Sequence, residues 1–261
     1  MTKHDLSIEP PIMNAAGALG FSADLHSEID WHGMGAFVTN PTSLARRTPA
    51  HGRRFTSFPG GFLLHTGYPN PGFSQVLRRY ARQWNRSPVP VIVHLLVRST
   101  DEVAQMVRRL EMVEGVAGVE IGLPGDASAG EVAGFTRAAA GELAVIMRLP
   151  LERASELAQE AVLAGAAAIS LAPPRGAYPV GNGEILQGRM YGPAVLPLAL
   201  HTIKELVRQG IPTIGAGGVY NREHVEAMLT AGALAVQLDS LLWRSGYRPS
   251  VYRRQDGNHQ N

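Results

Sequence analysis

The chain of 261 residues contains no cysteine, so it can form no disulfide, no thiolate metal site and no catalytic thiol. Its longest apolar stretch, around residues 161–172, is far shorter than the ~20 residues that a membrane-spanning helix needs. The N-terminal residues include His4, Asp5 and Glu9, where a signal peptide would have an apolar core. These absences predict a cytoplasmic protein.

Charge is also scarce, at 18% of the residues with a net charge of +2. Hydrophobic residues make up 45% of the chain, which is enough for a large core and argues against disorder. Of the 24 basic residues, only Lys3 and Lys204 are lysines. No block of basic residues lies beside interleaved aromatic residues, so we do not expect nucleic-acid binding.

Several catalytic motifs are absent as well. The nine histidines never occur at the helical spacing of two metal ligands, so we expect no metal site. Neither a Gly-Lys-Ser/Thr phosphate-binding loop nor a GxSxG nucleophile elbow is present.

The chain does contain eight short apolar runs that alternate with helical stretches. Strands buried on both faces are apolar throughout, as these runs are. Eight such units in about 250 residues predict one (β/α)8 TIM barrel domain over residues 1–261. A doubly wound open sheet uses the same units and is the alternative. The predicted strands are Ile12–Ala16, Ala36–Asn40, Val91–Val97, Val119–Leu123, Ala144–Leu149, Ala168–Ala172, Thr213–Ala216 and Ala235–Asp239.

Two long segments interrupt this alternation, after the second and the sixth predicted strands. They are Pro41–Gly72 and Pro173–Tyr191. The first is far longer than an ordinary connection, which predicts a lid or an extra hairpin. Because both segments follow the carboxyl end of a strand, we expect both to overhang the mouth of the barrel. The first segment also holds four arginines that form either an anion-steering rim or a solvated basic loop: Arg46, Arg47, Arg53 and Arg54.

Six sequence strings follow one another along most of the chain: MNAAGALG from Met13, GAFVTN from Gly35, GYPNPG from Gly67, YGPAVLPLAL from Tyr191, IPTIGAGGV from Ile211 and AGALAVQL from Ala231. In this order they resemble the dihydroorotate dehydrogenase family. That family comprises FMN-dependent (β/α)8 barrels that oxidise dihydroorotate to orotate in pyrimidine biosynthesis. The resemblance therefore implies a flavoprotein oxidoreductase that acts on CH–CH groups.

The resemblance also implies which residues lie near FMN. At two of these positions the family has lysines, whereas this chain has Asn40 on the second strand and Arg148 on the fifth. Gly217 and Gly218 either bring backbone N–H groups to a phosphate or only allow close packing. The full set of implied cofactor-binding residues is Ala15, Ala16, Gly17, Asn40, Arg148, Gly192, Gly217, Gly218, Asp239 and Ser240.

Asp239 and Ser240 stand where the family normally has Gly-Thr. A carboxylate repels a phosphate, by about 4 kcal/mol per unit charge at ~4 Å and an effective dielectric constant of ~20. FMN binding therefore requires Asp239 to turn away from the phosphate or Arg189 to compensate its charge. The alternative is that Asp239 caps the helical turn that follows.

The loop after the fourth strand lacks the base that the family uses. There the family has a segment of the type Asn-x-Ser-Cys-Pro-Asn, or a related one with serine as base, whereas this chain reads GLPGDA from Gly122. A positioned base typically contributes ~10²–10⁴-fold to the rate, so we expect dihydroorotate oxidation to be weak or absent. Ser128 either substitutes for this base or caps the helix that starts near Gly130.

The substrate-holding loop is altered too, because Leu64 stands where the family has a substrate-binding asparagine. Asn70 remains as a candidate substrate-binding residue, although an asparagine between two prolines also suits a turn. His65 is a second candidate, either as a base or proton shuttle or as a hydrogen-bonded loop histidine.

Arg148 and Ile146 share one face of the fifth strand, which the resemblance directs into the barrel. A buried guanidinium needs a partner, and Glu120 on the fourth strand is the nearest candidate. Arg148 therefore forms an ion pair with Glu120 or clamps an anionic ligand.

Three functions are compatible with these observations. The first, which we prefer, is an FMN-dependent oxidoreductase for orotate-like or other small carbonyl substrates. The second is a flavin-free barrel that binds a small anionic metabolite. The third is a non-catalytic partner subunit, and a homodimer is compatible with each because barrels of this family often dimerise.

Overall fold

The computed structural model describes residues 6–24 and 27–243. Its larger sheet contains eight parallel barrel strands and one short additional strand, β3 (Thr42–Ser43), which pairs with β6. The barrel strands are β1 (Ile12–Asn14), β2 (Phe37–Val38), β6 (Val91–Leu96), β7 (Val116–Gly122), β8 (Ala144–Pro150), β9 (Ala168–Ala172), β12 (Thr213–Ala216) and β13 (Ala235–Leu238).

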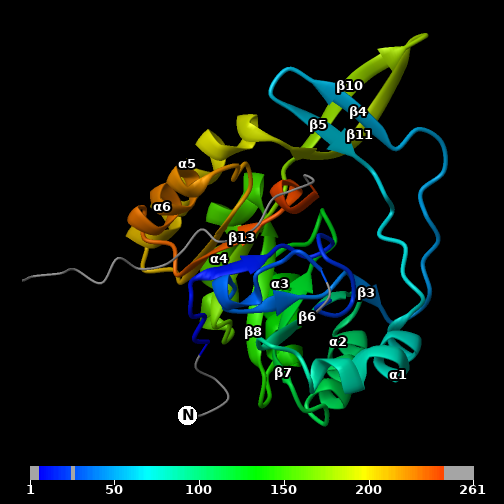
Figure 1. Cartoon of the computed structure of the whole chain (residues 1–261), viewed down its shortest axis with the longest axis vertical. Coiled ribbons are helices and arrows are strands. Elements are labelled where there is room, and N and C mark those ends of the chain that lie inside the picture. Colours follow the sequence, from blue (N-terminus) through cyan, green and yellow to red (C-terminus); the bar gives the residue numbers. More distant parts are fainter. Residues whose placement is uncertain (1–5, 25–26, 244–261) are drawn as a thin grey trace, which may run out of the picture.

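The barrel strands adjoin in the order β1, β13, β12, β9, β8, β7, β6 and β2 (Figure 1). A parallel bridge between Met13 and Ala36 joins β1 to β2 and closes the ring. The predicted (β/α)8 barrel is therefore confirmed. The open-sheet alternative is wrong, because an open sheet would leave β1 and β2 as separate edges.

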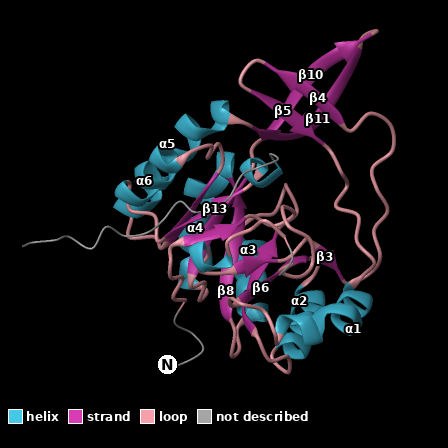
Figure 2. Ribbon diagram, in the orientation of Figure 1, coloured by secondary structure: helices cyan, strands magenta, loops and turns pink. Residues whose placement is uncertain are grey.

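In the described ranges six α-helices accompany the barrel strands. Figure 2 shows the helices in cyan. The second of them begins after Ser99, whose side chain accepts a hydrogen bond from the Glu102 backbone, and buries Val103, Met106 and Leu110 at helical spacing. No helix in the described ranges is long and apolar enough to cross a membrane. The helices are α1 (Phe73–Trp84), α2 (Thr100–Leu110), α3 (Ala129–Ala139), α4 (Ala154–Leu163), α5 (Leu196–Arg208) and α6 (Arg222–Thr230), and the 3₁₀ turns are η1 (Trp31–Gly33), η2 (Leu151–Arg153), η3 (Pro193–Val195) and η4 (Ser240–Trp243).

The two long segments form a second sheet with the antiparallel order β10, β11, β5, β4. Each segment supplies one hairpin, and ring contacts such as Phe62 on Tyr191, at 5.4 Å between centroids, join the two. Figure 1 shows this hairpin sheet standing beyond one end of the barrel, as predicted. Its strands are β4 (Phe55–Phe58), β5 (Gly61–Leu64), β10 (Arg175–Gly181) and β11 (Glu184–Tyr191).

Six of the eight predicted strands differ from the observed bounds by one to three residues at one end or both, and the differences are largest at β2 and β7. β2 is shorter than the predicted 36–40, because the backbone N–H of Asn40 donates to Gly20 rather than to a neighbouring strand. β7 starts at Val116 instead of Val119, because Val116 pairs with Val91 across a register shift. Such irregularities depend on the partner strand, which a single apolar run does not specify.

Side chains inside the barrel form layers, as is usual for this fold. One layer is apolar and includes Ile92 on β6 and Ile146 on β8. Residues two positions further along a strand point to the same side, so His94 and Arg148 belong to the next layer toward the carboxyl ends. That layer is polar and buried, and consists of His94, Glu120, Arg148, Ser170 and Gln237.

Candidate functional site

Three adjoining pockets lie at the mouth of the barrel. The outer chamber, of about 600 Å³, lies between the hairpin sheet and the barrel. The inner pocket, of about 240 Å³, reaches the ends of β6, β7 and β8. The side pocket, of about 190 Å³, lies beside β1 and β13. Tyr68 and Tyr191 line all three, and Arg148 lines both the inner and the side pocket.

The Glu120 carboxylate is the centre of the polar layer. Oε2 accepts from Nδ1 of His94 at 2.6 Å and from Nη1 of Arg148 at 3.2 Å. Oε1 accepts from Oγ of Ser170 at 2.6 Å and from Nε2 of Gln237 at 2.7 Å. Four other strands thus donate to one buried carboxylate, which fixes the position of each donor.

Burial disfavours the charged form of Glu120, but Arg148 and the hydrogen bond from His94 outweigh it and hold the pKa of Glu120 well below its usual range. Burial lowers the pKa of His94, despite the opposing effect of Glu120. Glu120 is therefore ionised at neutral pH, and His94 is neutral. Because an ionised carboxylate can only accept, Nδ1 of His94 carries the proton.

The ion pair between Arg148 and Glu120, one of the two alternatives for Arg148, is present. Arg148 also lines two pockets, so its guanidinium is held by Glu120 at the wall of the site. Glu120 raises the pKa of Arg148 although burial opposes this, so Arg148 is a fixed cation.

Sequence reasoning did not identify His94 as a site residue. Its ring lines the inner pocket, and the signal was a lone histidine in the apolar run Val91–Val97. That run had been interpreted only as a strand. Its contact with Glu120 depends on the parallel register of β6 and β7, which places His94 opposite Glu120.

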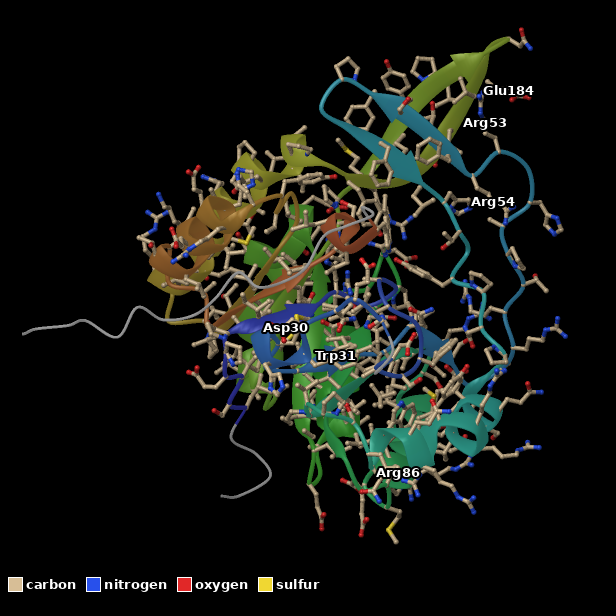
Figure 3. All side chains as sticks on the ribbon, viewed as in Figure 1. Asp30, Trp31, Arg53, Arg54, Arg86 and Glu184 are labelled. Carbon is tan, nitrogen blue, oxygen red and sulfur yellow. The ribbon has the colours of Figure 1, made fainter. Side chains whose placement is uncertain are left out.

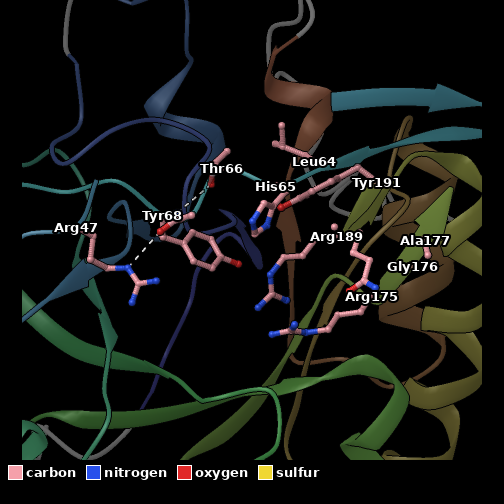
Figure 4. A pocket seen from close by; sticks show the side chains of 13 residues that line it. Arg47, Leu64, His65, Thr66, Tyr68, Arg175, Gly176, Ala177, Arg189 and Tyr191 are labelled. Atoms are coloured by element: carbon pink, nitrogen blue, oxygen red, sulfur yellow. Dashed lines mark hydrogen bonds between the residues drawn. The ribbon is translucent and has the colours of Figure 1, made fainter. Parts of the chain in front are cut away.

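Among the described residues, three arginines and no carboxylate line the outer chamber. Arg47 and Arg189 donate to the backbone oxygens of Gly67 and Pro173, at 3.2 and 3.1 Å. None of the three, which include Arg175, forms an ion pair within the described part of the chain. Figure 4 shows the guanidinium groups of Arg175 and Arg189 turned into the same space, with Arg47 on the opposite side. The chamber is therefore positively charged.

Of the four arginines predicted as a rim, only Arg47 lines this chamber. Arg53 donates to the backbone oxygen of Val180 at 2.8 Å, and Figure 3 places it beside Glu184 at the outer edge of the hairpin sheet. Arg46 and Arg54 are exposed. The rim is thus made instead by Arg47 together with two arginines of the second long segment.

The weaker catalytic candidates take different places. Ser128 is the N-cap of α3 and forms a reciprocal capping box with Glu131, so its structural alternative is the one observed. His65 lines the outer chamber and is exposed. Asn70 is buried, and its side chain hydrogen-bonds Ser43 and the backbone of Gly72, which is the turn role.

The residues that the resemblance assigned to FMN fall into two groups. Ala15–Gly17, Asn40, Arg148 and Asp239 line the side pocket together. Asn40 also accepts a hydrogen bond from the Gly20 backbone at 3.1 Å. The second group lines none of the three pockets within the described ranges, and consists of Gly192, Gly217, Gly218 and Ser240.

Gly217 and Gly218 form a buried turn after β12. Their φ angles are 102° and 74°, and a Cβ on Gly218 would collide with the backbone of Leu196 at the start of α5. Their backbone N–H groups donate to no other described residue. Gly192, at φ 121°, packs in the same way against Gly61. The turn therefore packs closely and also presents two backbone donors that have no acceptor among the described residues.

Asp239 accepts hydrogen bonds from both the backbone N–H and the hydroxyl of Ser240, and its own backbone oxygen accepts from Leu242. It therefore caps η4, as one of the two alternatives predicted. Burial raises the pKa of Asp239. Arg189 does not contact it, since the guanidinium of Arg189 lies over Tyr68 at 5.4 Å from the ring centroid.

The fold and the site define a class. This is a parallel (β/α)8 barrel with its polar pockets at the carboxyl ends of the strands, where such barrels place their ligands. A family model described as dihydroorotate dehydrogenase matches residues 2–145, and the chain belongs to this family.

The chain is 29% identical over 252 residues to the dihydroorotate dehydrogenase B (NAD(+)) catalytic subunit of Desulforudis audaxviator, covering 88% of this chain and 82% of that protein. It is 28% identical over 254 residues to the protein of the same name from Pelobacter propionicus, covering 89% of this chain and 84% of that protein. The similarity extends over most of both chains.

Proposed function

We propose that this protein is an FMN-dependent oxidoreductase of the dihydroorotate dehydrogenase type that acts on a small anionic substrate. The observation that carries the proposal is Arg148, a cation fixed by Glu120 where the side pocket and the inner pocket meet. FMN, when bound, would supply a hydride acceptor. A fixed cation beside the flavin ring stabilises the negative charge that reduction brings.

The phosphate end of FMN fits the turn after β12. The free backbone donors of Gly217 and Gly218 are buried, and a buried N–H without an acceptor is costly and rare. A phosphate oxygen would satisfy them, as at other glycine-rich turns. Asp239 does not prevent this, because its carboxylate is directed to Ser240 and burial raises its pKa.

The ring end of FMN fits the side pocket, which Ala15–Gly17 and Asn40 line together with Arg148. No lysine is needed there, because Arg148 provides the charge. Arg148 has the further advantage that its planar donors can serve Glu120 and a ligand together.

The positively charged lining of the outer chamber favours an anionic substrate. Arg47, Arg175 and Arg189 have no carboxylate partner among the described residues, so an anionic ligand would neutralise them. Tyr68 and Tyr191 offer flat apolar surfaces for a planar ligand. We expect dihydroorotate itself to be oxidised poorly, because Leu64 replaces the substrate-binding asparagine.

We also propose that the chain works as part of an assembly, since its relatives are named catalytic subunits. Phe55 and Ile185 of the hairpin sheet are 52% and 65% exposed, and a partner surface would bury them. A homodimer and a complex with a second subunit are the two candidates.

The absorption spectrum of protein purified without added cofactor tests the flavin proposal. We expect flavin bands that persist after incubation with FMN and desalting. Arg148→Met should weaken FMN retention, and Arg148→Lys, which restores the residue type of the family, should keep it. A colourless wild-type protein that refuses FMN would contradict the proposal and favour the flavin-free barrel that binds an anionic metabolite in the outer chamber.

A further inference from the structure

We propose that His94 is the general base of this site, oriented by Glu120, and that it replaces the side chain that the loop after β7 lacks. This rests on the proposed function for the location of the substrate but does not require FMN to be bound. Neither the family resemblance nor the named relatives assign a role to this residue.

The orientation of the ring is the first support. Nδ1 donates to Oε2 of Glu120 at 2.6 Å, and the carboxylate is itself held by Arg148, Ser170 and Gln237. A carboxylate that fixes the tautomer of a histidine leaves the other ring nitrogen with a free lone pair, as in the dyads of hydrolases. Nε2 is that free nitrogen.

The position of Nε2 is the second support. Nε2 hydrogen-bonds to no described residue, and it is not among the buried side-chain atoms without a partner, so it keeps contact with the pocket space. His94 as a whole is only 3% exposed. The nitrogen is therefore reachable from the inner pocket and otherwise shielded from solvent.

Gly122 is the third support, because it leaves room for the ring. A Cβ at Gly122 would lie 2.6 Å from Nε2 and 3.0 Å from Cε1 of His94, closer than van der Waals contact allows. In the family this position begins the segment with the missing base. The substitution that removes the family's side chain thus makes space for a base from the adjacent strand.

The charges around His94 suit a neutral base. Glu120 faces it from β7, Arg148 from β8 and Arg189 from β11, and burial together with the two arginines keeps the pKa of His94 below its ordinary value. His94 is thus ready to accept a proton at neutral pH. The remaining charged side chains of the inner pocket are Arg47, Arg98, Glu152 and Arg175.

The step is a proton transfer. Nε2 takes a proton from the carbon next to a substrate carbonyl, and the electron pair of the broken C–H bond remains on the substrate as an enolate. His94 becomes an imidazolium paired with Glu120, and Arg148 and Arg189 face the negative enolate. Full oxidation also needs a hydride acceptor of the flavin class, which takes a hydride from the neighbouring carbon. Return of the proton to the enolate needs no such acceptor.

Hydrogen exchange tests this step without flavin turnover. The probe is dihydroorotate, whose C5 methylene lies next to a carbonyl, at millimolar concentration in D₂O, and NMR follows the loss of the C5 proton signal. We expect the wild-type protein to accelerate exchange and His94→Gln to reduce this by ~10² or more. The matched control His201→Gln, an exposed histidine of α5 that lines none of the three pockets, should exchange like the wild type.

Equal exchange in His94→Gln and the wild type, or no acceleration by the wild type, would overturn the proposal. Exchange by a protein that refuses FMN would refute the proposed oxidoreductase while supporting His94 as the base. Flavin retention without exchange would support the proposed oxidoreductase and refute His94 as the base.

A second measurement does not depend on His94→Gln, in case that variant does not fold. ¹⁵N NMR of the histidine rings at pH 7 should show His94 with a protonated Nδ1 and an unprotonated Nε2. Glu120→Gln should raise the Nε2–H population and shift the pH profile of exchange, which loss of packing alone would not do. A wild-type Nε2–H tautomer, or an imidazolium at pH 7, would exclude the proposed base.

Discussion

At the scale of single residues, Glu120 decides the chemistry of the site. A carboxylate buried without partners would be protonated, but four donors and the charge of Arg148 keep it ionised. The same carboxylate fixes both Arg148 and His94, so the proposed flavin partner and the proposed base have one common support.

Arg148→Met should destabilise the protein by about 3–5 kcal/mol, because it leaves the buried charge of Glu120 without its counter-ion. Chemical denaturation measures this. The control Arg222→Met removes an exposed pair with Glu226 on α6 and should cost about 0.3–0.5 kcal/mol. Equal losses in the two variants would show that Glu120 does not depend on Arg148.

Stability should fall as the pH drops. The pKa of His94 is lower in the folded protein than the unfolded value of about 6.5, so the unfolded chain binds more protons below that pH and folding becomes less favourable. The lowered pKa of Glu120 adds a further loss below about pH 4.3. Urea denaturation from pH 8 to 5 should show the loss of stability caused by His94 in the wild type and in His65→Gln. His94→Gln should not show this loss. A flat wild-type profile would contradict this.

At the scale of elements, we expect the N-cap of α3 to contribute to stability and not to the chemistry of the site. Ser128→Ala should cost about 1 kcal/mol of stability, because α3 loses the N-cap of its capping box. The rate of dihydroorotate C5 exchange should not change. Thermal melting together with the exchange assay measures both, and a large loss of exchange without loss of stability would make Ser128 the base after all.

The hairpin sheet should determine anion affinity. Arg175→Gln removes one of three chamber arginines and should weaken orotate binding about tenfold, with a weaker dependence on salt. Isothermal titration calorimetry measures this, and the exposed Arg79→Gln on α1 is the control. Equal affinities of the two variants would mean that the anion binds outside the chamber.

At the scale of the whole molecule, the site exists only because the barrel closes. Glu120 meets Gln237 across 117 positions of sequence, and β1 meets β2 through one bridge. A ligand that binds only the closed barrel stabilises it. FMN at 100 times its dissociation constant should therefore add about 2.7 kcal/mol, seen as a higher melting temperature. No shift at saturating FMN would place the cofactor outside this barrel.

The sequence by itself determined the barrel and the two mouth segments, and it named Glu120 as the nearest partner for a buried Arg148. Apolar runs, glycine turns and the alternation of side chains along a strand are local patterns, so they can be recognised in a single sequence. The six sequence strings that resemble the family indicated which residues lie around the side pocket. The roles of Ser128 and Asn70 were left between two local alternatives, and in both cases the structure showed the hydrogen bonds of the structural one.

Only the tertiary structure decided which side chains face one another across the mouth. His94 looked like one polar residue in an apolar run, and the register of β6 against β7 brought it to Glu120. The outer chamber needed both hairpins, because Arg47 comes from one segment and Arg175 and Arg189 from the other. The physical reason is that strand register, burial and charge pairing are long-range properties, set by packing among distant parts of the chain.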